Sequence, residues 1–92
     1  MDTKGLYPFM YRGIAGDINM STKNGYYEAR SDYTSNFPPN AYTYGILEVF
    51  GGNIFLAQRY TPHSKYSGLS YGEFSRVMYN GEWTEWRFIP YQ

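Results

Sequence analysis

The chain has 92 residues, and its eight basic and eight acidic residues give no net charge. This length allows one domain with a single modest core. The charges are spread singly, so nucleic acid is not an expected partner. Cysteine is absent, which excludes a disulfide framework. No apolar run approaches the roughly 20 residues of a membrane span, and the N-terminus lacks a signal-peptide pattern, so we expect neither membrane insertion nor signal-directed export.

Aromatic residues make up 22% of the chain, and twelve residues are tyrosine. Tyrosine can bury a large ring while its hydroxyl stays in water, which suits strand faces, interfaces and sugar-facing surfaces. Ten glycines and five prolines favour a turn-rich architecture over long helices. The composition therefore predicts a small β domain in which many tyrosines cover the sheet.

Residues 1–16 follow neither a strand period nor a helix period, although several of their side chains are apolar. Such a segment should pack against its own domain, a partner subunit or a preceding domain. We assign it as an N-terminal segment, stem or linker, and we assign residues 17–92 as a knob-like β domain. One helical turn is allowed near Asp17–Thr22, where Asp17 is better explained as a cap than as a calcium ligand.

The first predicted strand is Tyr26–Arg30, which follows a turn at Lys23–Gly25. Residues 31–43 are predicted to form a loop, because Pro38-Pro39 cannot lie in a central ladder and polar residues surround it. Loops of about a dozen residues are uncommon and are often functional.

A hairpin is predicted where Tyr44–Phe50 and Asn53–Tyr60 flank Gly51-Gly52. The residues that a two-residue turn would oppose on one aliphatic face are Val49 with Ile54 and Leu47 with Leu56. The residues expected on the other face are Ile46, Glu48, Phe55 and Ala57. This partition predicts a sheet with one buried side.

After a second loop at residues 61–71, a closing hairpin is predicted from Gly72–Tyr79 and Glu82–Phe88, which flank Asn80-Gly81. Both central residues of a type I′ turn need a positive φ, which Gly adopts freely and Asn tolerates. The pairs that a two-residue turn predicts are Phe74 with Arg87, Arg76 with Glu85, Val77 with Thr84, and Met78 with Trp83. A three-residue turn would shift this register by one. The whole pattern predicts an all-β fold, a small antiparallel sheet or sandwich of about five strands.

Enzymatic chemistry has few candidate residues. The only histidine, His63, lies on a predicted loop, and no Gly-x-Ser-x-Gly pattern places a serine nucleophile. Glu82 and Glu85 are three residues apart in a strand, so they should point to opposite faces and cannot form a glycosidase pair. We predict no catalytic residue, no metal site and no cofactor.

Recognition by a surface is the remaining class of function. Sugar sites combine aromatic rings with fixed polar groups that bind hydroxyls, and the two loops supply both. The candidate ligand-binding residues are Tyr33, Asn36, Asn40 and Tyr42 in the first loop and His63, Lys65, Tyr66 and Tyr71 in the second. Each tyrosine could equally pack on the base of its loop or on a neighbouring subunit. Trp83 and Trp86 should point to opposite faces and serve packing.

Several short motifs, taken in order, carry a family resemblance. They are Asp17-Ile18-Asn19, Gly25-Tyr26-Tyr27, Tyr44–Val49, Ala57–Tyr60, and Arg76 followed by Tyr79-Asn80-Gly81-x-Trp83-x-x-Trp86-Arg87. In this order, residues 17–88 resemble the knob domain found at the tips of phage tail fibres and of pyocins. The resemblance implies a trimeric, non-enzymatic domain that contacts the host surface, usually a polysaccharide or another cell-wall glycan. The longer, tyrosine-rich loops depart from the usual pattern and leave the receptor class undefined.

The resemblance and the predicted hairpins together indicate a structural scaffold. The positions that match fold determinants of the family are Tyr27, Trp83, Trp86 and Arg87. The further scaffold residues are Leu47, Val49, Ile54, Leu56 and Arg76. We therefore expect a homotrimeric, host-receptor-binding domain of a virion tail, made in the host cytoplasm without a signal peptide. The alternative is a structural module that trimerises or caps a fibre and has no ligand of its own.

Overall fold

The computed structural model describes residues 9–52, 54–63 and 72–91. In these residues the chain forms seven strands and one short turn of 3₁₀-helix. Their bounds are Tyr11–Ile14 (β1), Ile18–Met20 (η1), Gly25–Arg30 (β2), Tyr44–Gly51 (β3), Phe55–Pro62 (β4), Gly72–Tyr79 (β5), Glu82–Trp83 (β6) and Arg87–Pro90 (β7). Within the described ranges, no helix has the length and apolar character that crossing a membrane requires.

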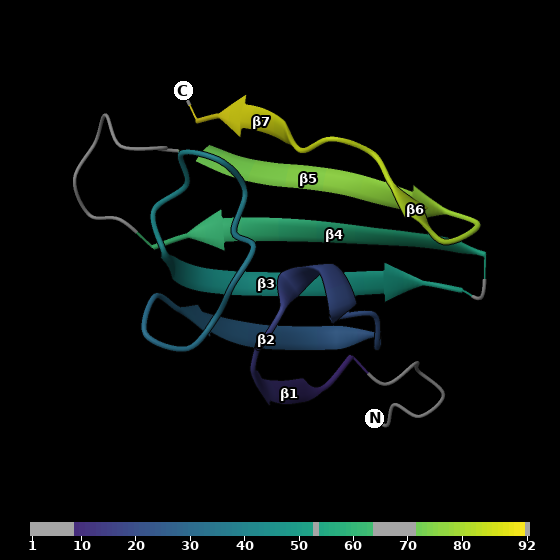
Figure 1. Ribbon diagram of the computed structural model, residues 1–92, viewed down its shortest axis with the longest axis horizontal. Helices are drawn as coiled ribbons and strands as arrows, with labels where there is room; N and C mark the ends of the chain where they lie inside the picture. Colours follow the sequence, from purple (N-terminus) through teal and green to yellow (C-terminus); the bar gives the residue numbers. More distant parts are fainter. Residues whose placement is uncertain (1–8, 53, 64–71, 92) are drawn as a thin grey trace.

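All of these strands belong to one sheet, in the order β1-β2-β3-β4-β5-β6, and β7 also pairs with β5 (Figure 1). β1 and β2 are parallel, and the other neighbours are antiparallel. The all-β, mainly antiparallel prediction is confirmed. More strands form than predicted, because β1 pairs at the edge without an alternating pattern and because the last predicted strand divides into β6 and β7. Through β1 and the backbone hydrogen bonds that flank it, residues 10–15 lie along β2 at the edge of the sheet.

The closing hairpin has the predicted turn. Asn80 has φ 53° and Gly81 has φ 90°, the two positive values of a type I′ turn. The predicted pair of Met78 with Trp83 is confirmed.

Beyond this point the register changes by one residue, so the predicted pairs of Phe74 with Arg87 and of Arg76 with Glu85 are wrong. Phe74 lies opposite Phe88 instead. The cause is Thr84, which forms hydrogen bonds with both the backbone carbonyl oxygen and the backbone N–H of Val77. Its N–H donates to the Val77 carbonyl oxygen over 2.8 Å, and its Oγ1 accepts from the Val77 N–H over 3.1 Å. Residues 84–86 therefore lie outside the strands, and the pairing of β5 with β7 is shifted by one residue from the predicted register.

The first hairpin has a longer loop than predicted. Val49 lies opposite Gln58, and Leu47 lies opposite Tyr60, so the predicted partners Ile54 and Leu56 are each wrong by four positions. Because this slip is an even number of residues, every strand side chain keeps its predicted face.

Gly51 explains why the turn does not lie at Gly51-Gly52. Gly51 is the last residue of β3 and pairs with Leu56. It has φ 148°, and a Cβ at this position would collide with the carbonyl oxygen of Phe55. The Gly52 N–H then donates to this same oxygen over 2.8 Å, which closes the loop.

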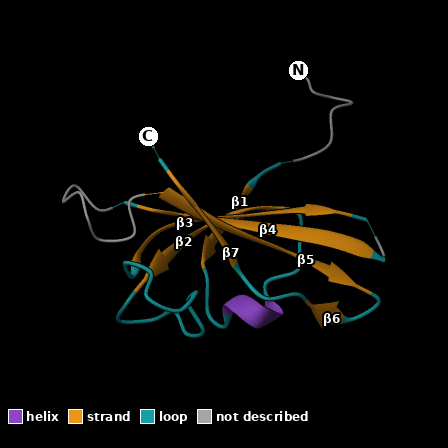
Figure 2. Ribbon diagram, turned by 90° about the horizontal axis from the view of Figure 1, so that it is seen from above, coloured by secondary structure: helices purple, strands orange, loops and turns teal. Residues whose placement is uncertain are grey.

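The core lies on one face of the sheet, here called the covered face. Its buried residues are Ile18, Ala29, Leu47, Val49, Tyr60 and Phe74. Figure 2 shows that η1 and the connecting loops gather on this side of the strands. The opposite side, the bare face, exposes alternate side chains of β3 to β5, including Phe50, Phe55, Val77 and Tyr79. The predicted one-sided burial is confirmed, and of the two predicted arrangements the described residues form the single sheet.

Candidate functional surfaces

A buried polar network joins η1 to the centre of the sheet. Gln58, which is 1% exposed, donates through Nε2 to the carbonyl oxygens of Ile18 and Ser21 over 2.8 and 2.9 Å. Its Oε1 accepts from Nε of Arg76 over 2.9 Å, and Nη2 of Arg76 donates to Oδ1 of Asn19 over 2.8 Å. Buried polar groups are costly unless they are paired, and these are paired with one another.

The guanidinium of Arg76 also lies between two indole rings. Its central carbon is 4.2 Å from the ring centroid of Trp83 and 4.2 Å from that of Trp86. The prediction that these tryptophans point to opposite faces is therefore wrong, because the interruption between β6 and β7 brings both rings to the covered face. Burial lowers the pKa of Arg76 to about 10, against the opposing effect of Asp17. We call Asn19, Gln58, Arg76, Trp83 and Trp86 the Arg76 cluster.

The other scaffold residues have mixed environments. Leu47 and Val49 are fully buried, and Tyr27 and Leu56 pack against the core. Ile54 precedes β4 and is 51% exposed, so it adds little to the core. Arg87 is exposed on β7, opposite Ser75.

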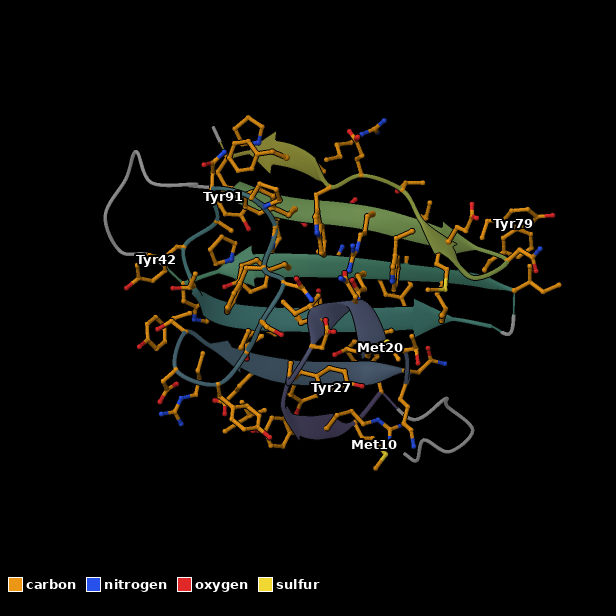
Figure 3. The ribbon with its side chains drawn as sticks, in the orientation of Figure 1. Met10, Met20, Tyr27, Tyr42, Tyr79 and Tyr91 are labelled. Carbon is orange, nitrogen blue, oxygen red and sulfur yellow. The ribbon has the colours of Figure 1, made fainter. Side chains whose placement is uncertain are left out.

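The predicted ligand-binding residues come together only in part. The ring of Tyr42 lies 6.0 Å from that of Tyr44, and the N–H of His63 donates to the Tyr44 carbonyl oxygen over 2.8 Å. Tyr42 and Tyr79 lie at opposite ends of the sheet (Figure 3). Tyr33, 65% exposed, and the exposed Asn36 and Asn40 belong to the loop that leads to the end at which Tyr42 lies. The predicted residues that lie outside the described ranges are Lys65, Tyr66 and Tyr71.

A hollow of about 520 Å³ on the bare face contains both rings and charges. Its lining residues are Phe9, Asn24, Glu48, Phe50, Gly51 and Arg59. Glu48 and Arg59 are direct neighbours across β3 and β4, and Nε of Arg59 donates to Oε1 of Glu48 over 2.7 Å. The same Nε is 3.6 Å from Oε1 of Glu73 on β5. The bond to Glu48 raises the pKa of Arg59, so the guanidinium stays charged.

Sequence reasoning missed this pair because of the register of the first hairpin. A two-residue turn placed Glu48 opposite Phe55, whereas the four-position slip places Glu48 opposite Arg59. A cross-strand pair of opposite charge is a recognisable signal, and testing alternative registers for such pairs would have found it.

A second concavity on the bare face is apolar. It measures about 480 Å³, and its lining residues are Phe50, Gly51, Phe55, Leu56, Ala57, Val77, Met78 and Tyr79. The rings of Phe55 and Tyr79 stack at 5.4 Å, and these two side chains are 67% and 61% exposed. We call this concavity the apolar groove.

Metal chemistry has little support in the part of the chain that the structure describes. Among those residues, no three His, Cys, Asp or Glu side chains come together as a group that could hold an ion. Asp17 instead caps η1, where its Oδ1 accepts from the Asn19 N–H over 2.9 Å.

No protein-family model and no curated protein sequence matches this chain. A solved structure of an N-truncated R2-type pyocin tail fibre, in its selenomethionine form, has a similar fold, with a TM-score of 0.64. The two chains are 17% identical, and the match covers 94% of this chain. This chain spans about a third of the pyocin chain, 34% of its length. The predicted resemblance to a tail-fibre domain is confirmed at the level of the fold.

Proposed function

We propose that this chain is a non-enzymatic receptor-binding domain of a phage tail fibre or of a phage-tail-like particle, and that it adsorbs to a bacterial cell-surface glycan. The observation that carries the proposal is the display of aromatic rings outside the core. Rings of this kind are exposed on the bare face, as at Phe50, and at the loop end of the sheet, as at Tyr33 and Tyr44. Exposed rings stack on the apolar faces of sugars. The fold likeness to a pyocin tail fibre supports the same function.

The proposed membership of a phage tail or tail-like particle implies where the domain acts. As part of a tail, the domain would be made in the host cytoplasm and would act outside the cell, on the surface of the next host. Several copies held together would turn a weak single-site affinity into durable attachment through avidity. We therefore propose that the domain acts as a homotrimer.

The experiment is binding of the purified, fluorescently labelled chain to whole bacteria and to arrays of bacterial surface polysaccharides. We expect retention on some strains and a signal from their extracted polysaccharide. The absence of binding across a broad strain panel would contradict the proposal. Release of reducing sugar from a bound polysaccharide would instead indicate an enzyme.

The apolar groove favours a second candidate, a structural module that trimerises or caps a fibre without a ligand of its own. Its lining contains no charged side chain, and the stacked Phe55 and Tyr79 are well exposed. Burial of such a surface between copies would be favourable, by about 25 cal/mol for each Å² of apolar area. Under this candidate, the chain associates with itself in solution and yet binds neither bacteria nor polysaccharide.

A further inference from the structure

We propose that the hollow on the bare face is a sugar-binding site that accepts an uncharged pyranose, with Phe50 as the stacking platform and the Glu48–Arg59 pair as the hydroxyl-binding groups. This inference rests on the proposed function, because it assigns the surface at which a glycan binds. It also moves the site away from the loop tyrosines that the sequence favoured.

Phe50 has the position of a platform. It is 43% exposed at the end of β3, where it lines the hollow together with Phe9. The Arg59 guanidinium lies over the Phe50 ring, with its central carbon 5.9 Å from the ring centroid, so charged donors are close to the ring. A pyranose that stacks on the ring would therefore have hydrogen-bond donors next to its hydroxyl groups.

The ion pair supplies donors and acceptors in a fixed orientation. The bond from Nε of Arg59 to Glu48 is short, at 2.7 Å, as charge-assisted bonds are. Both ion pairs that Arg59 makes with described residues run through Nε. A guanidinium has five N–H donors, which is more than the bond to Glu48 uses. Because the side chains are already held, binding costs less conformational entropy.

Asn24 adds a further polar group at the wall of the hollow. Its Nδ2 donates to the Gly51 carbonyl oxygen over 3.1 Å, which fixes the amide. Its Oδ1 is an acceptor of the kind that a sugar hydroxyl needs. The volume of about 520 Å³ falls within the range of small-molecule sites, roughly 300–1,000 Å³.

The charged residues around the hollow determine which class of sugar it can accept. Glu48 and Arg59 are the charged residues of the lining, and their charges cancel. The carboxylate of Glu73 lies beside Arg59 as well, so the guanidinium is already shared between two carboxylates. A sugar carboxylate would be repelled by these two groups, whereas the hydroxyls of a neutral hexose or N-acetylhexosamine would not.

The test is an NMR titration of the ¹⁵N-labelled full chain with glucose, galactose, N-acetylglucosamine and glucuronate as probes. We expect at least one neutral sugar to shift the side-chain signals of Arg59 Nε and Asn24 Nδ2 and the amide signal of Phe50. Glucuronate should bind about tenfold more weakly or not at all. Shifts confined to Tyr33, Tyr42 and Tyr44 would overturn the inference, as would glucuronate binding as tightly as the neutral sugars.

Variants decide the outcome where single sugars are too weak to titrate. Phe50→Ala and Arg59→Gln should each lower binding to bacteria or polysaccharide by about tenfold, and Phe50→Tyr should keep it. Ile89→Ala is the control, because Ile89 is 44% exposed on β7 and lines neither the hollow nor the apolar groove. Signal dispersion in the NMR spectrum verifies that each variant is folded.

The experiments distinguish an error in the proposed site from an error in the proposed function. If the wild-type chain binds bacteria and the Phe50 and Arg59 variants bind equally well, the hollow is not the site and the receptor-binding function stands. If the wild-type chain binds neither bacteria nor any polysaccharide or sugar, the proposed function itself is contradicted.

Discussion

Gln58 and Arg76 face each other across β4 and β5, and Nε of Arg76 donates to Oε1 of Gln58 over 2.9 Å on the covered face. Gln58→Leu keeps the size of the side chain and leaves Arg76 and the carbonyl oxygens of Ile18 and Ser21 without this partner. We expect a loss of about 2–4 kcal/mol in the free energy of unfolding, because buried polar groups would be left unpaired.

Urea denaturation followed by tryptophan fluorescence measures this loss, since Trp83 and Trp86 contact Arg76. Ser75→Ala, next to Arg76 on β5, is the control and should change stability by less than about 0.5 kcal/mol. Equal stability of Gln58→Leu and the wild-type chain would show that the network contributes little.

Tyr60 links stability to alkaline pH. Its hydroxyl donates to the Tyr42 carbonyl oxygen over 2.6 Å, and burial raises its pKa far above the ordinary value. In the unfolded chain Tyr60 ionises near pH 10, whereas in the folded chain it stays neutral. Its contribution is therefore complete below about pH 10 and is lost as pH rises further, by up to about 1.4 kcal/mol per pH unit.

Tyr60→Phe tests this linkage. At pH 8 we expect it to be less stable than the wild-type chain by about 1 kcal/mol, for the lost hydrogen bond. Above pH 10 this difference should shrink, because Phe cannot ionise. Urea titrations between pH 8 and pH 11 measure both values, and a constant difference over this range would contradict the raised pKa.

Two glycines with positive φ should respond unequally to the same substitution. Gly51→Ala forces φ 148° on an L-residue and also drives its Cβ into the Phe55 carbonyl oxygen. Gly81→Ala meets the backbone strain alone, because no atom lies within 4 Å of its Cβ position. We expect a loss of about 1 kcal/mol for Gly81→Ala and clearly more for Gly51→Ala. Thermal unfolding ranks the two, and the reverse order would contradict the β3–β4 register.

Self-association should depend on the apolar groove. Multi-angle light scattering at micromolar concentration should give the mass of three chains, and a monomer would contradict the trimer. Val77→Glu places a charge in the groove, where burial against a second copy is costly, so we expect dissociation. Met20→Glu is the control, because Met20 is 74% exposed on η1, over the covered face. Unchanged mass in Val77→Glu would exclude the groove as the contact.

The accuracy of the sequence predictions depended on how local the determining chemistry is. Asn80-Gly81 was predicted correctly because the turn type follows from the φ preferences of two residues. The tryptophans were misplaced because the break in the ladder comes from Thr84, whose hydroxyl replaces a backbone partner of Val77. Such competition between a side chain and the ladder leaves no periodic signal.

The candidate site was harder to predict than the fold. The predicted faces of the β3 and β4 side chains are correct although the predicted register is wrong, because the slip is an even number of residues. The predicted cross-strand neighbours are wrong. Glu48 and Arg59 meet only in the true register, so the register of a two-residue turn could not bring these lining residues of the hollow together. Loop composition then drew attention to Tyr33 and Tyr42, which lie at one end of the sheet.

The Arg76 cluster has a consequence for how the molecule is made. Asn19 bonds to Arg76, 57 residues later, and to the indole N–H of Trp83, 64 residues later. During synthesis on the ribosome, Asn19 of η1 therefore lacks these two partners until β5 and β6 have been made. Contacts across such separations close slowly and expose strand surface meanwhile. Nascent chains halted before Trp83 should therefore be the most protease-sensitive and should depend most on chaperones.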